Sequence, residues 1–229
     1  MENKITLTLL ANAGVLLDFG GRKVLVDGLY EAPPPGFSPI PGDALQRLMS
    51  AEPPFDGIEL LFFTHEHPDH YSGRLTELYS ANNAPKMTVK PDGSYRRLRL
   101  GDGFEAELLP TRHLDERFAD VLHRGIVFSF RGRRILITAD TDYTAETFSS
   151  LAETELDAVL LNPLFFSALC RGNYFKGRLN AKRYIIYHLP FPQDDSYKMN
   201  AALERSLKLW DGSRGEAIPL TECLQTLTL

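Results

Sequence analysis

The stretch Thr64-His65-Glu66-His67-Pro68-Asp69-His70 holds three of the six histidines of this 229-residue chain. It follows residues 58–63, a continuous apolar run typical of a strand buried on both faces. Loops at strand ends collect reactive side chains, and imidazoles with a carboxylate are ligands for zinc, iron, nickel or manganese. Alternate residues of an extended segment share a face, so His65 and His67 are expected to point the same way. We therefore predict a metal site, with a histidine-rich surface loop or a hydrogen-bonded cluster in the core as the alternatives.

The spacing of this cluster resembles the HxHxDH signature of the metallo-β-lactamase-fold hydrolases, and the match is complete. That family has three further ligands downstream, each placed after a later strand. The chain offers one candidate for each: His113 in LLPTRHLD, Asp140 in ILITADTD and His188 in RYIIYHLPF. All three follow apolar runs, so the resemblance extends over nearly the whole chain.

The resemblance implies two divalent metal ions, with zinc as the first choice and manganese, iron or nickel also compatible. Seven side chains would hold them, three for each ion and one carboxylate between the ions: His65, His67 and His113; Asp69, His70 and His188; and Asp140. Two such cations about 3.5–4 Å apart repel strongly, so carboxylates and a bridging hydroxide are needed to hold them. The hydroxide would be the nucleophile, and Asp69 and Asp140 are the predicted catalytic carboxylates.

Three further residues are candidates for supporting the metals or contacting substrate: Asp27, Asn12 and His123. Asp27 matches a family position that resembles an acid orienting a ligand histidine, and capping of a turn is the alternative. Asn12 stands in the first turn, where one branch of the family often carries a histidine. His123 has no place in the ligand set. A solvent-exposed or structural imidazole is the favoured interpretation, and a substrate contact or proton donor is the alternative.

The compact chain and the short hairpin before TADT resemble the lactonase-like branch, which includes relatives of ascorbate-phosphate lactonase. This resemblance implies a hydrolase that acts on a lactone or another ester. A phosphodiesterase of the same fold is one alternative. A non-catalytic metal-binding sensor or interaction module is another, although the complete ligand set argues against it. Residues 162–182 hold candidates for a pocket lip, with core packing as the alternative: Phe165, Phe166, Tyr174, Phe175 and Lys176.

Composition and charge bear on partners and location. The chain has 25 basic and 30 acidic residues and a net charge of −5, which argues against nucleic acid or an anionic membrane as the main partner. We expect a small-molecule substrate, and a homo-oligomer is compatible with the sequence. Cys170 and Cys223 match no zinc or disulfide spacing and are expected to be reduced thiols. No signal-peptide layout or long apolar run is found, so a cytoplasmic protein is predicted.

The element pattern predicts one domain, residues 1–229, of the α+β class with many strands and few helices. Helices are predicted at four places: 43–50, 72–79, 144–154 and 197–209. Residues 162–182 are predicted to lack a regular helix. The family resemblance implies a four-layer αβ/βα sandwich, in which two mixed sheets carry helices on their outer faces.

Overall fold

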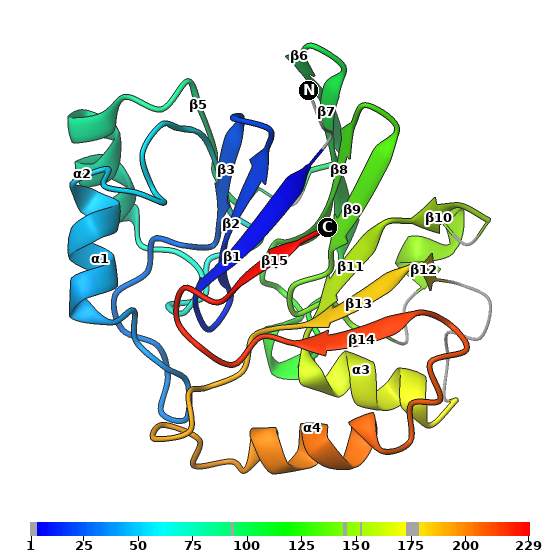
Figure 1. The fold of residues 1–229 in the computed structure, drawn as a ribbon. Coiled ribbons are helices and arrows are strands. Elements are labelled where there is room, and N and C mark those ends of the chain that lie inside the picture. The colour runs from blue at the N-terminus through cyan, green and yellow to red at the C-terminus, as the bar shows by residue number, and fades with distance from the viewer. Residues whose placement is uncertain (1–3, 93, 144–145, 152, 173–178) are drawn as a thin grey trace. The chain divides into compact units, whose positions relative to one another are not determined.

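A computed structural model describes residues 4–92, 94–143, 146–151, 153–172 and 179–229 (Figure 1). The chain forms two compact units, each with its own mixed β-sheet. The first unit comprises Met1–Pro91, Leu189–Tyr197 and Thr221–Leu229. The second comprises Asp92–His188 and Lys198–Leu220. The predicted α+β class with two mixed sheets is therefore confirmed.

The first unit is built on a six-stranded sheet. Its strands lie in this spatial order: β15 (Thr226–Thr228), β1 (Ile5–Ala11), β2 (Gly14–Phe19), β3 (Lys23–Val26), β4 (Ile58–Phe62) and β5 (Met87–Val89). Neighbours from β15 to β3 are antiparallel, whereas β3, β4 and β5 are parallel. The helices α1 (Gly42–Met49) and α2 (Gly73–Asn83) lie together on one side of this sheet (Figure 1).

Local sequence explains the limits of α2. The Ser72 hydroxyl accepts a hydrogen bond from the Leu75 N–H at 3.2 Å and caps the start of the helix. The helix continues to Asn83, four residues beyond the predicted end at residue 79, and stops where Ala84 adopts a left-handed conformation with φ of 47°. The prediction ended too early because the polar residues after position 79 carry no apolar periodicity.

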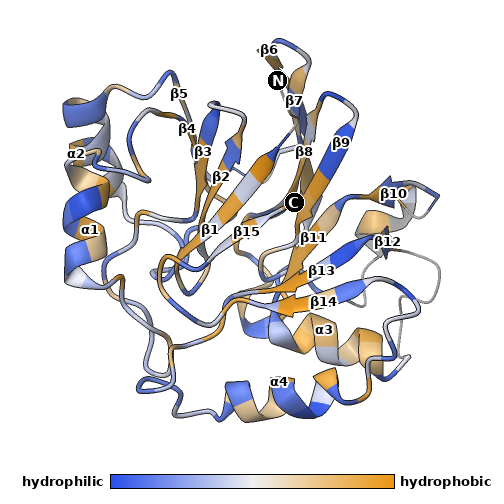
Figure 2. Ribbon diagram, viewed as in Figure 1, coloured by the Kyte–Doolittle hydropathy of each residue, from blue (hydrophilic) through white to orange (hydrophobic). Residues whose placement is uncertain are grey.

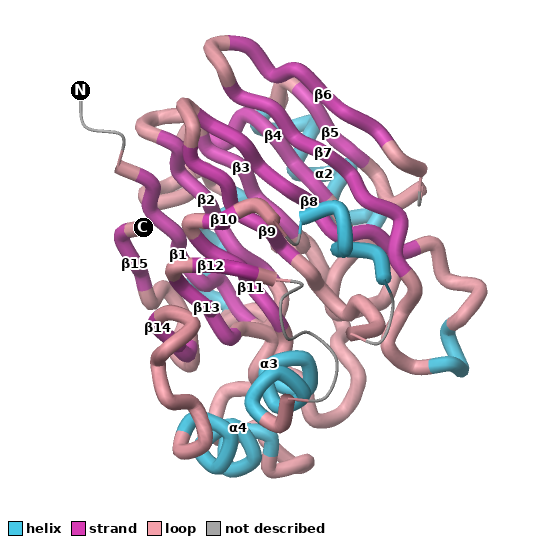
Figure 3. The backbone as a smooth tube through the Cα atoms, turned by 90° about the vertical axis from the view of Figure 1, so that its right-hand side faces the viewer, coloured by secondary structure: helices cyan, strands magenta, loops and turns pink. Residues whose placement is uncertain are grey.

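The second unit is built on a seven-stranded sheet. Its strands lie in this spatial order: β14 (Glu216–Pro219), β13 (Arg183–Ile186), β11 (Ala158–Leu161), β9 (Arg133–Ile137), β8 (His123–Phe130), β7 (Phe104–Thr111) and β6 (Arg96–Gly101). The strands from β14 to β9 are parallel, and those from β9 to β6 alternate in direction. A separate short pair joins β10 (Glu155–Leu156) to β12 (Asn180–Ala181). Figure 3 shows β6 to β9 running side by side.

The helices of the second unit are α3 (Pro163–Cys170) and α4 (Met199–Leu207), with short 3₁₀ helices at Glu116–Phe118 and Glu146–Leu151. Trp210, just after α4, joins both helices to the sheet. Its ring centroid lies 5.2 Å from that of Phe166 on α3 and 4.9 Å from that of Tyr184 on β13. In Figure 2 the strands of each sheet are largely orange, as expected for strands buried in a core. None of the helices in the described part of the chain is long and apolar enough to cross a membrane.

Two helix predictions in the second unit are corrected. Residues 162–182 do contain a regular helix, because Asn162 caps α3 and Pro163 occupies its first turn. The predicted helix at 144–154 is a 3₁₀ helix over Glu146–Leu151, and residues 144, 145 and 152 lie outside the described residues. Phe165 and Phe166 are fully buried, which agrees with core packing. Tyr174, Phe175 and Lys176 lie outside the described residues.

Candidate metal centre

The first ligand group consists of His65, His67, Asp69 and His70 in the loop after β4. Strand β4 is parallel to β3, so the carboxyl ends of both strands meet at one edge of the sheet. Asp27 follows β3 at that edge, and its N–H donates to the Phe62 carbonyl at 3.0 Å. Strand topology therefore brings Asp27 next to the histidine loop.

Asp27 and Thr64 fix the orientation of two histidine rings. The Thr64 hydroxyl donates to Asp27 Oδ2 at 2.6 Å, so towards His65 Nδ1, 3.0 Å away, it acts as an acceptor. Asp27 Oδ2 also lies 2.9 Å from His70 Nδ1, and a carboxylate only accepts. Both Nδ1 atoms therefore carry protons, so Nε2 is the nitrogen through which each neutral ring would bind a metal ion.

The imidazoles of the first ligand group are crowded, with His65 and His70 buried and His67 half-buried. His65 Nε2 lies 3.0 Å from His67 Nδ1, and the rings of His65 and His70 are 4.0 Å apart at their centroids. Because His65 Nε2 bears a lone pair, a proton or a metal ion is needed between it and His67. His70 Nε2 faces Asp69 Oδ2 at 3.8 Å, which is too long for a hydrogen bond.

Asn12 contacts Asp69 from the turn between β1 and β2. Its side-chain N–H donates to Asp69 Oδ2 at 3.2 Å, and the residue is fully buried. Its φ of 48° lies in the left-handed region, which asparagine tolerates better than most residues. Asn12 therefore lies beside Asp69, and its role in supporting the metals or contacting substrate stays a prediction.

The second ligand group consists of His113, Asp140 and His188. They follow β7, β9 and β13, three strands that run in the same direction, so their carboxyl ends lie at one edge of the sheet. The segments around His113 and Asp140 pair directly. The Leu114 N–H donates to the Asp140 carbonyl at 2.7 Å, and His113 forms an isolated antiparallel bridge with Thr141.

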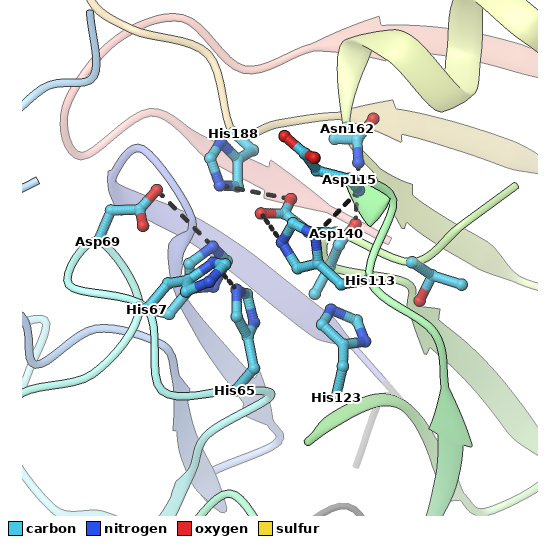
Figure 4. Close-up of polar contacts among 12 residues, drawn as sticks. His65, His67, Asp69, His113, Asp115, His123, Asp140, Asn162 and His188 are labelled. Carbon is cyan, nitrogen blue, oxygen red and sulfur yellow. Dashed lines mark hydrogen bonds and ion pairs between the residues drawn. The ribbon is translucent and has the colours of Figure 1, made fainter. Parts of the chain in front are cut away.

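The two carboxylate oxygens of Asp140 face different imidazoles (Figure 4). Oδ1 lies 3.5 Å from His188 Nε2, and Oδ2 lies 3.7 Å from His113 Nε2. Both distances exceed a hydrogen bond but suit two ligand atoms that each bind the same ion at about 2.0–2.2 Å. The donor set therefore fits divalent metals. Within the described residues, the His and Asp groups that could hold a metal ion are built from the seven predicted ligands.

His113 is oriented by a backbone donor. The Asp115 N–H donates to His113 Nδ1 at 3.0 Å, as the dashed line in Figure 4 marks. A neutral ring that accepts at Nδ1 carries its proton on Nε2. To bind a metal ion through Nε2, the neutral His113 ring would have to carry its proton on Nδ1 instead, so the contact with the Asp115 N–H would have to be given up.

Asn162 is a supporting residue that the sequence analysis missed. Its Oδ1 accepts from the Phe165 N–H at 2.9 Å, while its Nδ2 donates to the Ala139 carbonyl at 3.1 Å. Ala139 precedes Asp140 and has φ of 48°, and His188 has φ of 60°. Such left-handed conformations are costly in non-glycine residues and persist where the surroundings enforce them. The Asn-Pro pair, a helix-start signal, could have pointed to Asn162.

His123 lies at the start of β8 and is buried, which excludes the solvent-exposed interpretation. Its Nδ1 is hydrogen-bonded with the Thr111 hydroxyl on β7, and its ring centroid lies 5.7 Å from that of His113. It neighbours a predicted ligand without being one. Its action on substrate stays a prediction.

Solved structures resemble the whole chain. The metallo-β-lactamase fold protein YhfI from Bacillus subtilis is 14% identical, with 100% of both chains covered and a TM-score of 0.65. The chain has the metallo-β-lactamase fold. The isothiocyanate hydrolase from Delia radicum gut bacteria is 16% identical, with 98% of this chain and 99% of that chain covered and a TM-score of 0.65.

The same fold occurs in a protein whose name gives a different activity. CmlA, a diiron β-hydroxylase from Streptomyces venezuelae, is 19% identical with a TM-score of 0.63, and this chain covers 55% of its length. Neither the scan against family models nor the search of curated proteins finds a match. At these identities the metallo-β-lactamase fold is established, and the lactonase-like branch stays a prediction.

Proposed function

We propose that this protein is a metal-dependent hydrolase with a dinuclear centre, in which both ligand groups bind the ions jointly. The observation that carries the proposal is the position of Asp140, whose two oxygens face two different imidazoles. A carboxylate with that arrangement is suited to bridge two cations. The proposed ligand sets are His65, His67 and His113 for one ion, Asp69, His70 and His188 for the other, and Asp140 for both.

The chemistry divides between the ions and the chain. Divalent ions bound here would activate water and polarise the electrophile. Asp27 and Thr64 keep the Nε2 atoms of His65 and His70 unprotonated, so both rings are ready to bind metal without rearrangement. Asn12 holds Asp69 in place through its amide N–H.

We propose a lactone or another ester as the substrate. An acyl carbon is an electrophile that such a centre can attack, and the resemblance of the sequence to the lactonase-like branch supports this class. A phosphodiester is the alternative within the same fold. A sensor that binds metal without turnover is the alternative from another class, and the retention of all seven ligands argues against it.

The experiment measures metal content and turnover together. Protein loaded with Zn²⁺ or Mn²⁺ is tested on lactones, aryl esters, bis-nitrophenyl phosphate and isothiocyanates, with chelator-treated protein as the control. We expect metal-dependent hydrolysis of at least one lactone or ester, lost on chelation and restored by the metal. If only the phosphodiester is hydrolysed, the lactone or ester assignment would be wrong and a phosphodiester would take its place as the proposed substrate. No turnover of any substrate by protein that holds two metals would contradict the hydrolase proposal.

A further inference from the structure

We propose that Phe118, Val121 and Leu122 form an apolar patch beside the metal centre and bind an uncharged acyl or alkyl group of the substrate. These residues lie between His113 and His123, in the connection from β7 to β8. The inference rests on the proposed function, because it takes the metal centre as the place where the substrate reacts.

The segment that carries the patch has a regular local structure. The Asp115 carboxylate accepts from the Arg117 N–H at 2.9 Å and caps the 3₁₀ helix Glu116–Phe118. The turn is continued by hydrogen bonds between residues three apart: the Phe118 N–H to the Asp115 carbonyl at 2.9 Å and the Val121 N–H to the Phe118 carbonyl at 3.0 Å. These hydrogen bonds keep Val121, which is half-buried, close along the chain to Phe118.

The patch is accessible and touches a predicted ligand. Phe118 is 38% exposed and Leu122 is 58% exposed. Single exposed apolar side chains are common and need no explanation. Phe118 differs from these because its ring packs edge-on against the His113 imidazole, with centroids 5.2 Å apart. A substrate that reacts at His113 would therefore meet this ring with the part next to its reactive carbon.

The segment that carries the patch is hydrogen-bonded to the second ligand group. The Asp115 N–H is bonded to His113 Nδ1 at 3.0 Å, and the Leu114 N–H is bonded to the Asp140 carbonyl at 2.7 Å. At the other end of the segment, His123 is hydrogen-bonded to Thr111 on β7. A surface fixed in this way needs little ordering when a ligand binds, which favours affinity.

Charge around the patch decides between apolar and anionic groups. Asp115 and Arg117 form an ion pair, with Arg117 Nη2 2.5 Å from Asp115 Oδ2, and the Arg117 guanidinium also lies over the Phe118 ring, 5.7 Å from its centroid. Glu116 and Asp120 are exposed and add two negative charges to the same segment. An anionic group such as a free carboxylate or phosphate would be repelled there, whereas an uncharged hydrocarbon would lose its contact with water. The patch thus points to a neutral ester or lactone with an apolar substituent.

The test compares chain lengths in matched variants. Metal-loaded wild type, Phe118→Ala, Leu122→Ala and Leu209→Ala are assayed on 4-nitrophenyl esters from acetate to octanoate. Leu209, just after α4, is the control, because it is 62% exposed and lies outside the site. We expect kcat/KM to rise up to about fourfold per added methylene in wild type and Leu209→Ala. The rise is expected to be much smaller in Phe118→Ala and reduced in Leu122→Ala, with metal content unchanged in all four proteins.

A second measurement tests the patch without turnover. Straight-chain hydroxamic acids bind metal ions through their head group, so calorimetry gives the dependence of Kd on chain length. The patch proposal would be wrong if kcat/KM and Kd in wild type do not depend on chain length. It would also be wrong if that dependence changes equally in Phe118→Ala and Leu209→Ala. Neither result would contradict the proposed hydrolase function. A different result would separate the two proposals. If no ester is hydrolysed, but Kd still falls with chain length in wild type and no longer does so in Phe118→Ala, the proposed function would be contradicted and the patch supported.

Discussion

At the scale of single residues, one carboxylate sets the protonation of two predicted ligands. Asp27 accepts from the Thr64 backbone N–H at 2.8 Å, from the Thr64 hydroxyl and from His70 Nδ1. Through the Thr64 hydroxyl it also fixes the ring of His65. The sequence predicted an orienting acid at Asp27, and its contacts are those of such an acid.

Asp27→Asn is expected to weaken metal binding by about 10–100-fold. If the Asn carbonyl accepts from the Thr64 N–H, the amide N–H₂ group faces the Thr64 hydroxyl and His70 Nδ1. Two donors, the amide N–H₂ and the His70 Nδ1–H, would then oppose each other. His70 is therefore expected to carry its proton on Nε2 instead. Metal affinity is measured by competition with a chromophoric chelator. Asp18→Asn is the matched control, since Asp18 only accepts from the Gly21 N–H. Equal affinities in the two variants would show that Asp27 does not set the tautomer.

His123→Ala is expected to leave metal stoichiometry at the wild-type value, whatever its effect on rate. The ring packs near His113 but contacts Thr111, so its loss removes no proposed ligand. Elemental analysis of the purified variant gives the stoichiometry. A loss of one metal equivalent would mean that the sixth histidine belongs to the ligand set.

At the scale of elements, the seven predicted ligands follow strands, and the sequence analysis missed part of what supports them. Strand ends were recognisable from apolar runs, which is why His113, Asp140 and His188 could be named before the strand directions were known. The α3 helix was missed because residues 162–182 were interpreted by their aromatic content and not by the Asn-Pro start signal. The contact from Asn162 to Ala139 joins residues 23 positions apart, and no local pattern encodes it.

Asn162 caps α3 with its Oδ1 and donates to the turn before Asp140 with its Nδ2. Two substitutions remove these hydrogen bonds differently. Asn162→Asp keeps the capping oxygen but loses the N–H₂ group that donates to Ala139, whereas Asn162→Ala loses both. We expect Asn162→Ala to lower the free energy of unfolding by about 1–2 kcal/mol, from the lost cap and hydrogen bond. Urea unfolding measures this change, with Ser72→Ala on α2 as the cap control. A cost for Asn162→Ala no larger than that of Ser72→Ala would mean that the contact to Ala139 contributes nothing.

Asp157 is expected to make the free energy of unfolding depend on pH. Although burial opposes ionisation, hydrogen bonds from the Arg134 N–H at 2.9 Å and Lys182 Nζ at 3.1 Å hold the Asp157 pKa below its ordinary value. Its stabilisation is therefore present above the unfolded pKa of about 3.9 and is lost as pH falls through the folded value. We expect Asp157→Asn to be destabilised at pH 7, with the difference from wild type shrinking below about pH 4. Urea unfolding across that range checks it, and a constant difference would contradict it.

At the scale of the whole molecule, the fold was predicted from the HxHxDH segment and three downstream residues, and overall composition contributed little. Net charge and hydropathy described an ordinary acidic globular chain, and the resemblance of the HxHxDH segment supplied the architecture. Two solved structures that are 16 and 19% identical share that architecture, and one is an isothiocyanate hydrolase whereas the other is a β-hydroxylase. The fold therefore does not identify the substrate, which has to be inferred from side chains around the proposed centre, such as Phe118.

The most direct test of the account is the metal stoichiometry of wild type and Asp140→Ala, measured by elemental analysis after equilibration with Mn²⁺, with electron paramagnetic resonance on the same samples. We predict two equivalents per chain in wild type with the signal of a coupled pair. In Asp140→Ala we predict at most one tightly bound equivalent, no coupling and no hydrolysis, because the two cations lose their shared anion. Asp140→Ala that retains two tightly bound, coupled ions, or wild type that binds no more than one, would contradict the account.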